Sequence, residues 1–168
     1  MRRRFSLVLL MTLLTPPPVF AVQTAEWIKV APTGGGFSIV MPTKPEEETK
    51  VEDGFASHSF SLMTDKTVYI VEYGDYAPSI KLNVAGELAA NRDNFVKGLS
   101  AKLLDSKDIT LDGRAGLEFT CESSQASAKS RVYLFGNRVF MIAAAVLSGK
   151  TDTENVDRFF ASFAFTKE

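Results

Sequence analysis

Histidine and cysteine, which often supply a catalytic base or nucleophile, occur once each in this chain of 168 residues, as His58 and Cys121. A nucleophilic cysteine needs a neighbouring cation or a helix N-terminus that lowers its pKa. Cys121 instead alternates with Leu117 and Phe119 along a predicted strand, which places its thiol on the apolar face. We interpret Cys121 as a small buried hydrophobic residue, and a single cysteine excludes an internal disulfide or a multi-thiolate metal site.

His58 could serve as a general base if a nucleophile and an orienting acid converged on it. The nearest hydroxyls in sequence belong to Ser57 and Ser59, but the alternation of a strand directs these side chains to the face opposite His58. His58 instead shares its face with Phe60 and Leu62. The pattern therefore predicts a partly buried structural histidine.

Carboxylates could support hydrolysis if two of them met in a concave pocket with their pKa values pushed apart. The candidates on predicted strands are Glu72, Asp75 and Glu118. Glu118 and Glu122 alternate with the apolar residues of their strand, so we expect both to face solvent. A carboxylate-dependent hydrolase is therefore the alternative to a protein without catalytic activity.

Two further patterns could bind an ion or a phosphate group. The acids of the polar segment 43–54 supply the oxygen ligands that calcium prefers, but their spacing matches no calcium loop, and we interpret the segment as a solvated surface loop. Gly34-Gly35-Gly36 precedes a strand and is followed by no Lys-Ser/Thr pair, so it lacks the features of a phosphate loop. We expect no catalytic residue, no metal and no cofactor.

The composition is that of an ordinary globular domain, with 45% hydrophobic residues. The chain has 19 Lys and Arg residues against 20 Asp and Glu residues. Proteins that bind nucleic acid normally carry a clear excess of basic residues. The balance of charges therefore argues against a nucleic-acid partner.

The N-terminus has the layout of a secretory signal peptide. Three arginines at positions 2–4 precede an apolar run from Phe5 to Leu14, and three prolines then interrupt the chain before Ala21. The apolar run is far shorter than the roughly 20 residues that span a bilayer, although an uncleaved membrane anchor is the alternative. We predict that residues 1–21 are removed after Ala21. The mature chain, residues 22–168, should then be mildly acidic, fold as a single domain and not be embedded in the membrane.

Alternating apolar and polar residues predict short strands in the first part of the mature chain. The expected strands cover residues 27–30, 37–41, 55–64 and 68–76. The spacing then changes to that of an amphipathic helix over residues 84–104, with Asn83 as its N-cap. Arg92 falls on the apolar side of this helix, and we expect its stem to pack while its guanidinium reaches water.

The second half of the chain predicts a meander of strands followed by a helix. Asp112-Gly113 and Gly136-Asn137 are turn signals that join successive strands, and the Ser- and Ala-rich residues 123–128 are expected to form a loop. Residues 151–154 match a capping box that opens the last helix. One apolar stripe follows on that helix, formed by Val156, Phe159, Phe160 and Phe163. The order of elements predicts an α+β fold with a mostly antiparallel sheet flanked by helices.

Four segments of the mature chain, spread over residues 26–166, combine turns, core aromatics and strand ends in a familiar way. They are Gly36-Phe37-Ser38-Ile39-Val40-Met41-Pro42 with Lys44-Pro45, Leu111-Asp112-Gly113-Arg114-Ala115-Gly116-Leu117-Glu118-Phe119, Arg131-Val132-Tyr133-Leu134-Phe135-Gly136-Asn137-Arg138 and Phe159-Phe160-Ala161-Ser162-Phe163. Together they resemble small exported bacterial proteins of the PsbP-like fold, which is shared by an extrinsic protein of photosystem II and a Ran-binding nuclear-import regulator. The resemblance implies an antiparallel sheet flanked by helices and a protein that binds or assists other proteins without catalysis. It transfers no functional residue, because none can be matched position by position.

Together, the residues and the resemblance predict an exported accessory protein of the cell envelope, either periplasmic or secreted. We expect it to bind a partner protein or a small ligand and to catalyse no reaction. The expected partner is another envelope protein, of an identity that the sequence does not specify.

Overall fold

The computed structural model describes residues 26–52 and 55–166, which form ten strands and two helices. The predicted signal peptide, residues 1–21, lies outside the described residues. The strands are β1 (Ile28–Val30), β2 (Phe37–Met41), β3 (Glu46–Glu52), β4 (Phe55–Met63), β5 (Thr67–Tyr76), β6 (Lys102–Leu111), β7 (Arg114–Glu122), β8 (Ala126–Phe135), β9 (Arg138–Leu147) and β10 (Ala164–Phe165). The helices are α1 (Val84–Gly98) and α2 (Thr153–Ser162).

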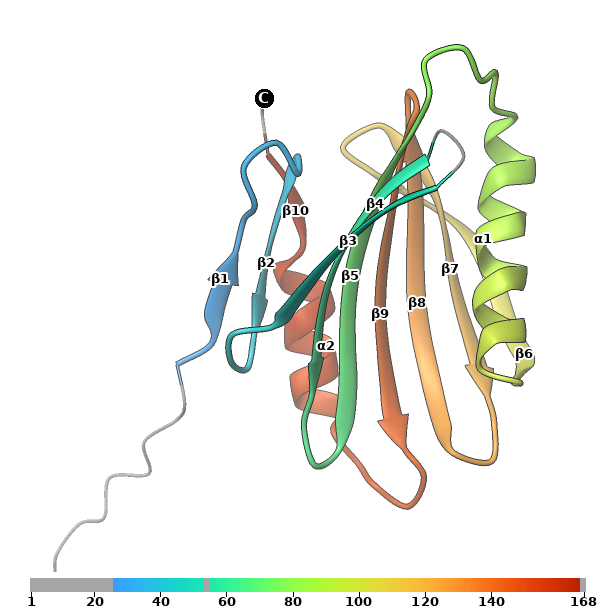
Figure 1. Cartoon of the computed structure of the whole chain (residues 1–168). Helices are drawn as coiled ribbons and strands as arrows, with labels where there is room; N and C mark the ends of the chain where they lie inside the picture. The colour runs from blue at the N-terminus through green and yellow to red at the C-terminus, as the bar shows by residue number, and fades with distance from the viewer. Residues whose placement is uncertain (1–25, 53–54, 167–168) are drawn as a thin grey trace, which may run out of the picture.

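Seven of these strands form one antiparallel sheet in the order β3-β4-β5-β9-β8-β7-β6, and β1, β2 and β10 form a smaller sheet with β2 in the middle. Helix α1 covers one face of the large sheet, and α2 and the small sheet lie on the other side (Figure 1). The predicted α+β fold with an antiparallel sheet flanked by helices is confirmed. In the described part of the chain, neither helix has the length and apolar character that crossing a bilayer requires.

The core between the large sheet and the small sheet is rich in aromatic rings. Phe37 of β2 is 1% exposed, and the centroid of its ring lies 5.9–6.4 Å from those of Phe60, Tyr73, Phe140 and Phe163. Most of these pairs meet edge to face, the arrangement that the aromatic quadrupole favours. This cluster attaches the small sheet to the large one.

The apolar stripe predicted for the last helix is confirmed. Phe159 and Phe160 of α2 are 0% and 4% exposed, and Phe163, the residue after the helix, is 7% exposed. All three belong to the aromatic core on this side of the large sheet. Burial of this stripe, at positions i, i+1 and i+4, therefore holds α2 against the molecule.

The capping box predicted for residues 151–154 is wrong, because Asp152 is the N-cap residue and no side chain caps the helix. The Asp152 carboxylate instead accepts hydrogen bonds at 2.7 Å from the hydroxyls of Thr67 and Tyr69 on β5. Burial alone would raise the pKa of Asp152, but these bonds and one from Asn155 lower it below its usual range. The sequence signal for a helix start was correct, but the carboxylate accepts from two hydroxyls of the sheet and from the Asn155 side chain, and it caps no backbone N–H of the helix.

Helix α1 is shorter than the predicted range 84–104, because the chain reverses direction after Gly98 and enters β6. Ser100, at φ 49, adopts the left-handed conformation in this reversal. Leu103 fits the helical spacing but packs from β6 against the core beneath α1. Asn83 is the N-cap, as predicted, and its side chain accepts a hydrogen bond from a backbone N–H of the first turn.

The prediction of a surface loop over residues 43–54 is wrong for residues 46–52, which form β3, an entirely exposed strand. β3 pairs with β4 at one edge of the large sheet and lacks apolar alternation because neither of its faces is covered. Its glutamates and Lys50, which lies 3.1 Å from Glu48, place charge on this edge, and such charge discourages pairing with other chains.

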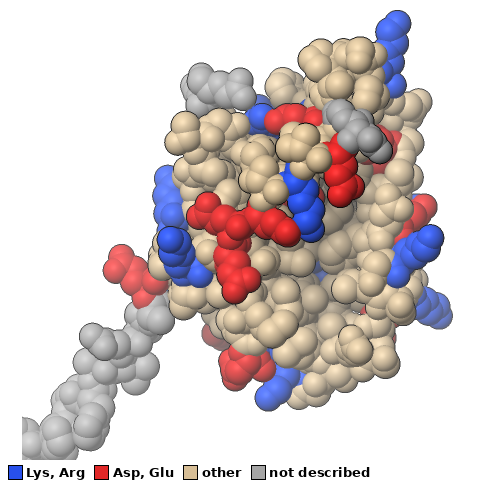
Figure 2. Space-filling view, viewed as in Figure 1, with Lys and Arg blue, Asp and Glu red and all other residues tan. Residues whose placement is uncertain are grey.

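Acidic and basic side chains are interspersed over the face of the molecule seen in Figure 2.

The loop predicted for residues 123–128 is shorter in the structure, because β8 already begins at Ala126. The turn predicted at Asp112-Gly113 is confirmed, with φ values of 51 and 75. Left-handed conformations at both central residues are typical of a type I′ hairpin turn, which matches the twist of the two strands it joins. This turn makes Arg114 the first residue of β7.

Candidate functional site

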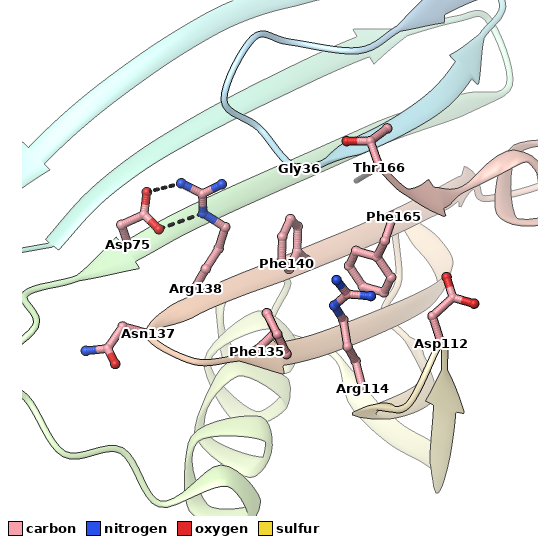
Figure 3. A pocket seen from close by; sticks show the side chains of 10 residues that line it. All are labelled: Gly36, Asp75, Asp112, Arg114, Phe135, Asn137, Arg138, Phe140, Phe165 and Thr166. Carbon is pink, nitrogen blue, oxygen red and sulfur yellow. Dashed lines mark hydrogen bonds and ion pairs between the residues drawn. The ribbon is translucent and has the colours of Figure 1, made fainter. Parts of the chain in front are cut away.

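A cavity of about 630 Å³ lies at one end of the large sheet, where two of its hairpin turns approach the small sheet (Figure 3). The residues that line it come from the end of β5, the β6–β7 and β8–β9 hairpins, β10 and the segments beside β2 and β10. They are Gly36, Asp75, Asp112, Arg114, Phe135, Asn137, Arg138, Phe140, Phe165 and Thr166. The volume lies within the range of sites for small molecules.

Arg114 projects from the start of β7 between two phenylalanine rings (Figure 3). Its guanidinium carbon lies 4.5 Å from the ring centroid of Phe135 and 4.2 Å from that of Phe165. The Nε atom is buried and has no hydrogen-bond partner among the described residues. Asp112 lines the same cavity, yet no ion pair joins it to Arg114. The guanidinium therefore retains both its charge and its capacity to donate.

Arg138 is held differently. Its Nε and Nη2 atoms donate to the two carboxylate oxygens of Asp75 at 2.6 and 2.7 Å, and its Nη1 atom donates to the carbonyl of Gly34 at 2.6 Å. The two residues are direct partners in the antiparallel register of β5 and β9. The guanidinium carbon also lies 4.9 Å from the ring centroid of Tyr73. Asp75 pairs with Arg138, whereas Arg114, the second cation of the cavity, has no ion pair among the described residues.

The walls of the cavity combine this charge with apolar surface. Phe135 is 59% exposed and Phe140 is 3% exposed, whereas Phe165, on strand β10 of the small sheet, is partly buried. No histidine, cysteine or serine is among the ten lining residues. The arrangement can hold an anionic group and cover an apolar one.

His58 and Cys121 lie outside this cavity, in the surroundings that the strand pattern predicts. The His58 ring stacks on that of Tyr73 at a centroid distance of 4.7 Å, and its Nδ1 atom lies 2.9 Å from the Thr49 hydroxyl. Cys121 is 1% exposed on the face toward α1, and burial raises the pKa of its thiol. His58 contacts one hydroxyl, on the exposed strand β3, and no carboxylate contact orients its ring among the described residues, whereas Cys121 lies among apolar residues.

The prediction that Glu118 faces solvent is wrong, because this residue is only 9% exposed. Its carboxylate lies 2.9 Å from Lys107 Nζ, 3.4 Å from Lys129 Nζ and 2.7 Å from Arg131 Nε. Burial alone would raise the pKa of Glu118, but hydrogen bonds from Lys107 and Arg131, and the charges of Lys129 and Arg131, lower it to about 2. The polar residues of β7 are covered here because Phe160 of α2 packs over Lys129 and Arg131.

The three carboxylates considered for hydrolysis do not converge. Glu72 lies in a smaller hollow with Glu87 and Asn91 of α1, and burial raises its pKa, whereas Asp75 lies on the other side of the sheet. Glu118 stands on β7, three strands from β5 in the sheet order, which corresponds to about 14 Å at the usual strand spacing. The structure therefore assembles no pair of acids from this set.

Two further candidates are placed plainly by the structure. The Arg92 guanidinium donates to Asp93 at 2.8 Å and to the hydroxyl of Ser106 on β6 at 3.2 Å, and its side chain is 23% exposed. The acids of β3 are all exposed. Within residues 26–52 and 55–166, no group of three or more His, Cys, Asp and Glu residues could hold a metal ion.

Comparison with solved structures identifies the fold. No protein-family model matches the chain, and no curated protein is similar to it in sequence. The solution structure of CyanoP, the cyanobacterial PsbP of Synechocystis sp. PCC 6803, matches it with a TM-score of 0.59 and 13% sequence identity, over 91% of this chain and 99% of that one. The fold is PsbP-like. A solved structure from Bacteroides thetaiotaomicron VPI-5482 reaches a TM-score of 0.38 at 15% identity, over 83% of this chain and 48% of that one.

The cavity lined by the ten residues given above, hereafter the Arg114 pocket, was not predicted from the sequence. Arg114 and Phe135 stand beside turns that the sequence predicts, and both lie in segments that carried the resemblance. Phe165, however, reaches Arg114 only because β10 returns to pair with β2. No local pattern in the sequence predicts that long-range pairing, so the contact between Phe165 and Arg114 could not be predicted.

Proposed function

We propose that this protein is an exported, non-catalytic accessory protein of the cell envelope that binds a partner protein or a small ligand in the Arg114 pocket. The observation that carries the proposal is the state of the Arg114 guanidinium. It is stacked between two rings, its Nε atom is buried without an acceptor, and no carboxylate pairs with it among the described residues. A hydrogen bond to a charged group contributes about 1.5–3 kcal/mol, so an acceptor bound at the accessible edge of the partly buried Arg114 guanidinium would gain that much.

The non-catalytic part of the proposal is supported by the placement of the reactive side chains. His58 is occupied by Tyr73 and Thr49, and Cys121 is buried in the core. Of the candidate acids, Asp75 is paired with Arg138, and Glu118 is surrounded by three cations. We propose that the protein needs no cofactor and acts by binding alone.

The export part of the proposal is supported by the sequence of residues 1–21, with its basic start, short apolar run and cleavage signal. The PsbP-like fold supplies a compact domain with a large aromatic core for the mature chain. With this leader, the domain is proposed to act in the periplasm or outside the cell. Its partner there is proposed to be an envelope protein or a small molecule, and not a nucleic acid.

The test compares the full-length protein with its Arg114→Gln and Arg158→Gln variants, each expressed with a C-terminal affinity tag behind a flexible linker. Arg158 is the matched control, because its guanidinium carbon also stacks on an aromatic ring, 4.5 Å from the centroid of Trp27, but it does not line the cavity. Proteins and small molecules that copurify from the envelope fraction are quantified by mass spectrometry. We expect one component to be recovered equally with the natural protein and Arg158→Gln, and about tenfold less with Arg114→Gln.

Equal recovery with all three proteins would remove the Arg114 pocket as the binding site. The non-catalytic part has its own contrary outcome. Hydrolysis of a panel of ester and glycoside substrates that is abolished by Glu72→Gln, Asp75→Asn or Glu118→Gln, without loss of folding, would establish the carboxylate-dependent hydrolase.

A further inference from the structure

We propose that the Arg114 pocket selects a ligand that carries a single carboxylate on an apolar, preferably aromatic, body. The inference rests on the proposed binding function and names the chemical class of its ligand. The carboxylate would accept hydrogen bonds from the edge of the Arg114 guanidinium. The apolar body would lie against the rings of Phe135, Phe140 and Phe165.

The first argument is the direction from which Arg114 can be reached. The rings of Phe135 and Phe165 stack on the guanidinium, with their centroids 4.5 and 4.2 Å from its central carbon (Figure 3). Because the N–H bonds of a guanidinium lie in its plane, an acceptor must approach along the edge that the rings leave free. A planar carboxylate can accept two parallel bonds in that plane.

The second argument is the balance of charge around the cavity. Both oxygens of Asp75 already accept from Arg138, so this pair contributes little net charge. Asp112 lines the cavity without pairing to Arg114. The two acids and two arginines that line the cavity sum to zero charge, so an anion must be held by direct bonds to Arg114, and the second charge of a phosphate dianion would add repulsion from the carboxylates of Asp75 and Asp112.

The third argument is the apolar wall. Phe135 is 59% exposed although it stacks on Arg114, so one of its faces is available to a ligand. Phe140 and Phe165 continue this surface into a cavity of about 630 Å³, which is larger than a carboxylate alone needs. Covering exposed aromatic surface is favourable, so an apolar body beside the charged group adds affinity.

A free aromatic acid and the C-terminal carboxylate of a polypeptide share this chemistry, and the test separates the two sources. The probes for the first are phenylacetate, its neutral isostere phenylacetamide, acetate and phenyl phosphate. The probes for the second are the tripeptide Ala-Ala-Phe with a free C-terminus and the same peptide amidated. Binding to the full-length protein is followed by amide chemical shifts in NMR titrations at millimolar ligand.

We expect phenylacetate to shift the amides of Arg114, Phe135 and Phe165 and to bind at least about tenfold more tightly than phenylacetamide or acetate. The free peptide should bind at least about tenfold more tightly than its amidated form if a polypeptide C-terminus is the source, and no better than it if the source is a free acid. The Arg114→Gln substitution should weaken carboxylate binding about tenfold, Arg114→Lys should restore part of it, and Arg158→Gln should leave it unchanged. Unchanged amide dispersion in each variant confirms that it folds.

Three outcomes would overturn the inference. Equal affinity for phenylacetate and phenylacetamide would show that the charge is not recognised, and tighter binding of phenyl phosphate would show that the class of anion is wrong. If the binding seen in either case is lost in the Arg114→Gln variant, the pocket remains the binding site and only the proposed ligand class is refuted. Shifts confined to the apolar cavity of about 410 Å³ beside α1, lined by Ile70, Phe95 and Ala143 among others, would place carboxylates at a different site.

Discussion

Two carboxylates of this protein, those of Glu118 and Asp152, are held by hydrogen bonds and charges within the fold. Glu118 is enclosed by Lys107, Lys129 and Arg131, and Asp152 accepts bonds from two hydroxyls of β5. Both carboxyl groups have lowered pKa values, so both are held as anions by their partners. Arg114 is the opposite case, since its charge and its buried Nε atom lack such partners among the described residues. This contrast separates residues that hold the fold from one that can hold a ligand.

Replacement of Glu118 should reveal its contribution through the pH dependence of stability. The folded-state pKa of about 2 lies below the ordinary value of 4.5, so the unfolded chain binds the proton first as the pH falls. The stabilisation is complete above about pH 4.5 and is lost as the pH falls toward 2. At pH 7, Glu118→Gln should lower the free energy of unfolding by about 3 kcal/mol, measured by urea denaturation.

The same variant should lose less stability than the natural protein between pH 5 and pH 2, because it lacks this titrating group. Glu122→Gln, an exposed position on the same strand, is the control and should change stability by at most about 0.5 kcal/mol. A Glu118→Gln profile parallel to that of the natural protein would contradict the assignment.

The thiol of Cys121 should react slowly in the folded protein. It is 1% exposed, and burial raises its pKa, so both access and thiolate formation are suppressed. In a labelling experiment with a chromogenic thiol reagent at pH 8, reaction should become fast only when urea unfolds the chain. Fast labelling under native conditions would show that the face of β7 toward α1 opens readily.

At the scale of elements, α2 is held by its aromatic stripe and by one polar attachment at its start. Phe160→Ala should destabilise the protein by about 3–5 kcal/mol, because it empties a site that is 4% exposed and removes the ring beneath Lys129 and Arg131. Thermal and urea unfolding measure this loss. Asp157→Ala, at an exposed position on the same helix, is the control, and an equally small effect at both positions would refute the packing of α2 described above.

The elements that could be predicted from sequence are those whose pattern is local. Alternation predicted β2, β4 and β5, and Asp112-Gly113 predicted its hairpin, since the residues in a strand or a turn determine their own spacing. β3 escaped prediction because an uncovered edge strand has no apolar face to reveal it. Residues 99–104 were assigned to a helix because Leu103 suits both periods, and only the reversal at Ser100 separates them.

The candidate site was less predictable than the fold. The alternation of apolar and polar residues along β7 predicts that Glu118 faces solvent. Glu118 is buried only because α2 covers that face of the large sheet. Arg114 lies in a segment that carried the resemblance, but its placement between two rings depends on Phe165, from the far end of the chain. A single sequence contains the residues of such a site and no signal that they meet.

At the scale of the whole molecule, the proposed export predicts where the mature chain begins. If residues 1–21 are a signal peptide, the protein recovered from the cell envelope should begin at or near Val22. Edman sequencing or intact-mass measurement checks this. A protein that begins at Met1 would contradict cleavage and favour the uncleaved anchor, and Ala21→Arg should block processing at this point.

The closing of the small sheet ties the two ends of the domain together. The Val40 amide donates to the Ser162 hydroxyl across 122 residues, and β10 pairs with the far side of β2. Such a non-local union forms only after the last residues of the domain have left the ribosome. During synthesis, Phe165 can therefore pack against Arg114 only after β10 has been made and has paired with β2. Until residues 164–165 are available, β2 lacks one of its two neighbouring strands, so the domain cannot complete its native packing.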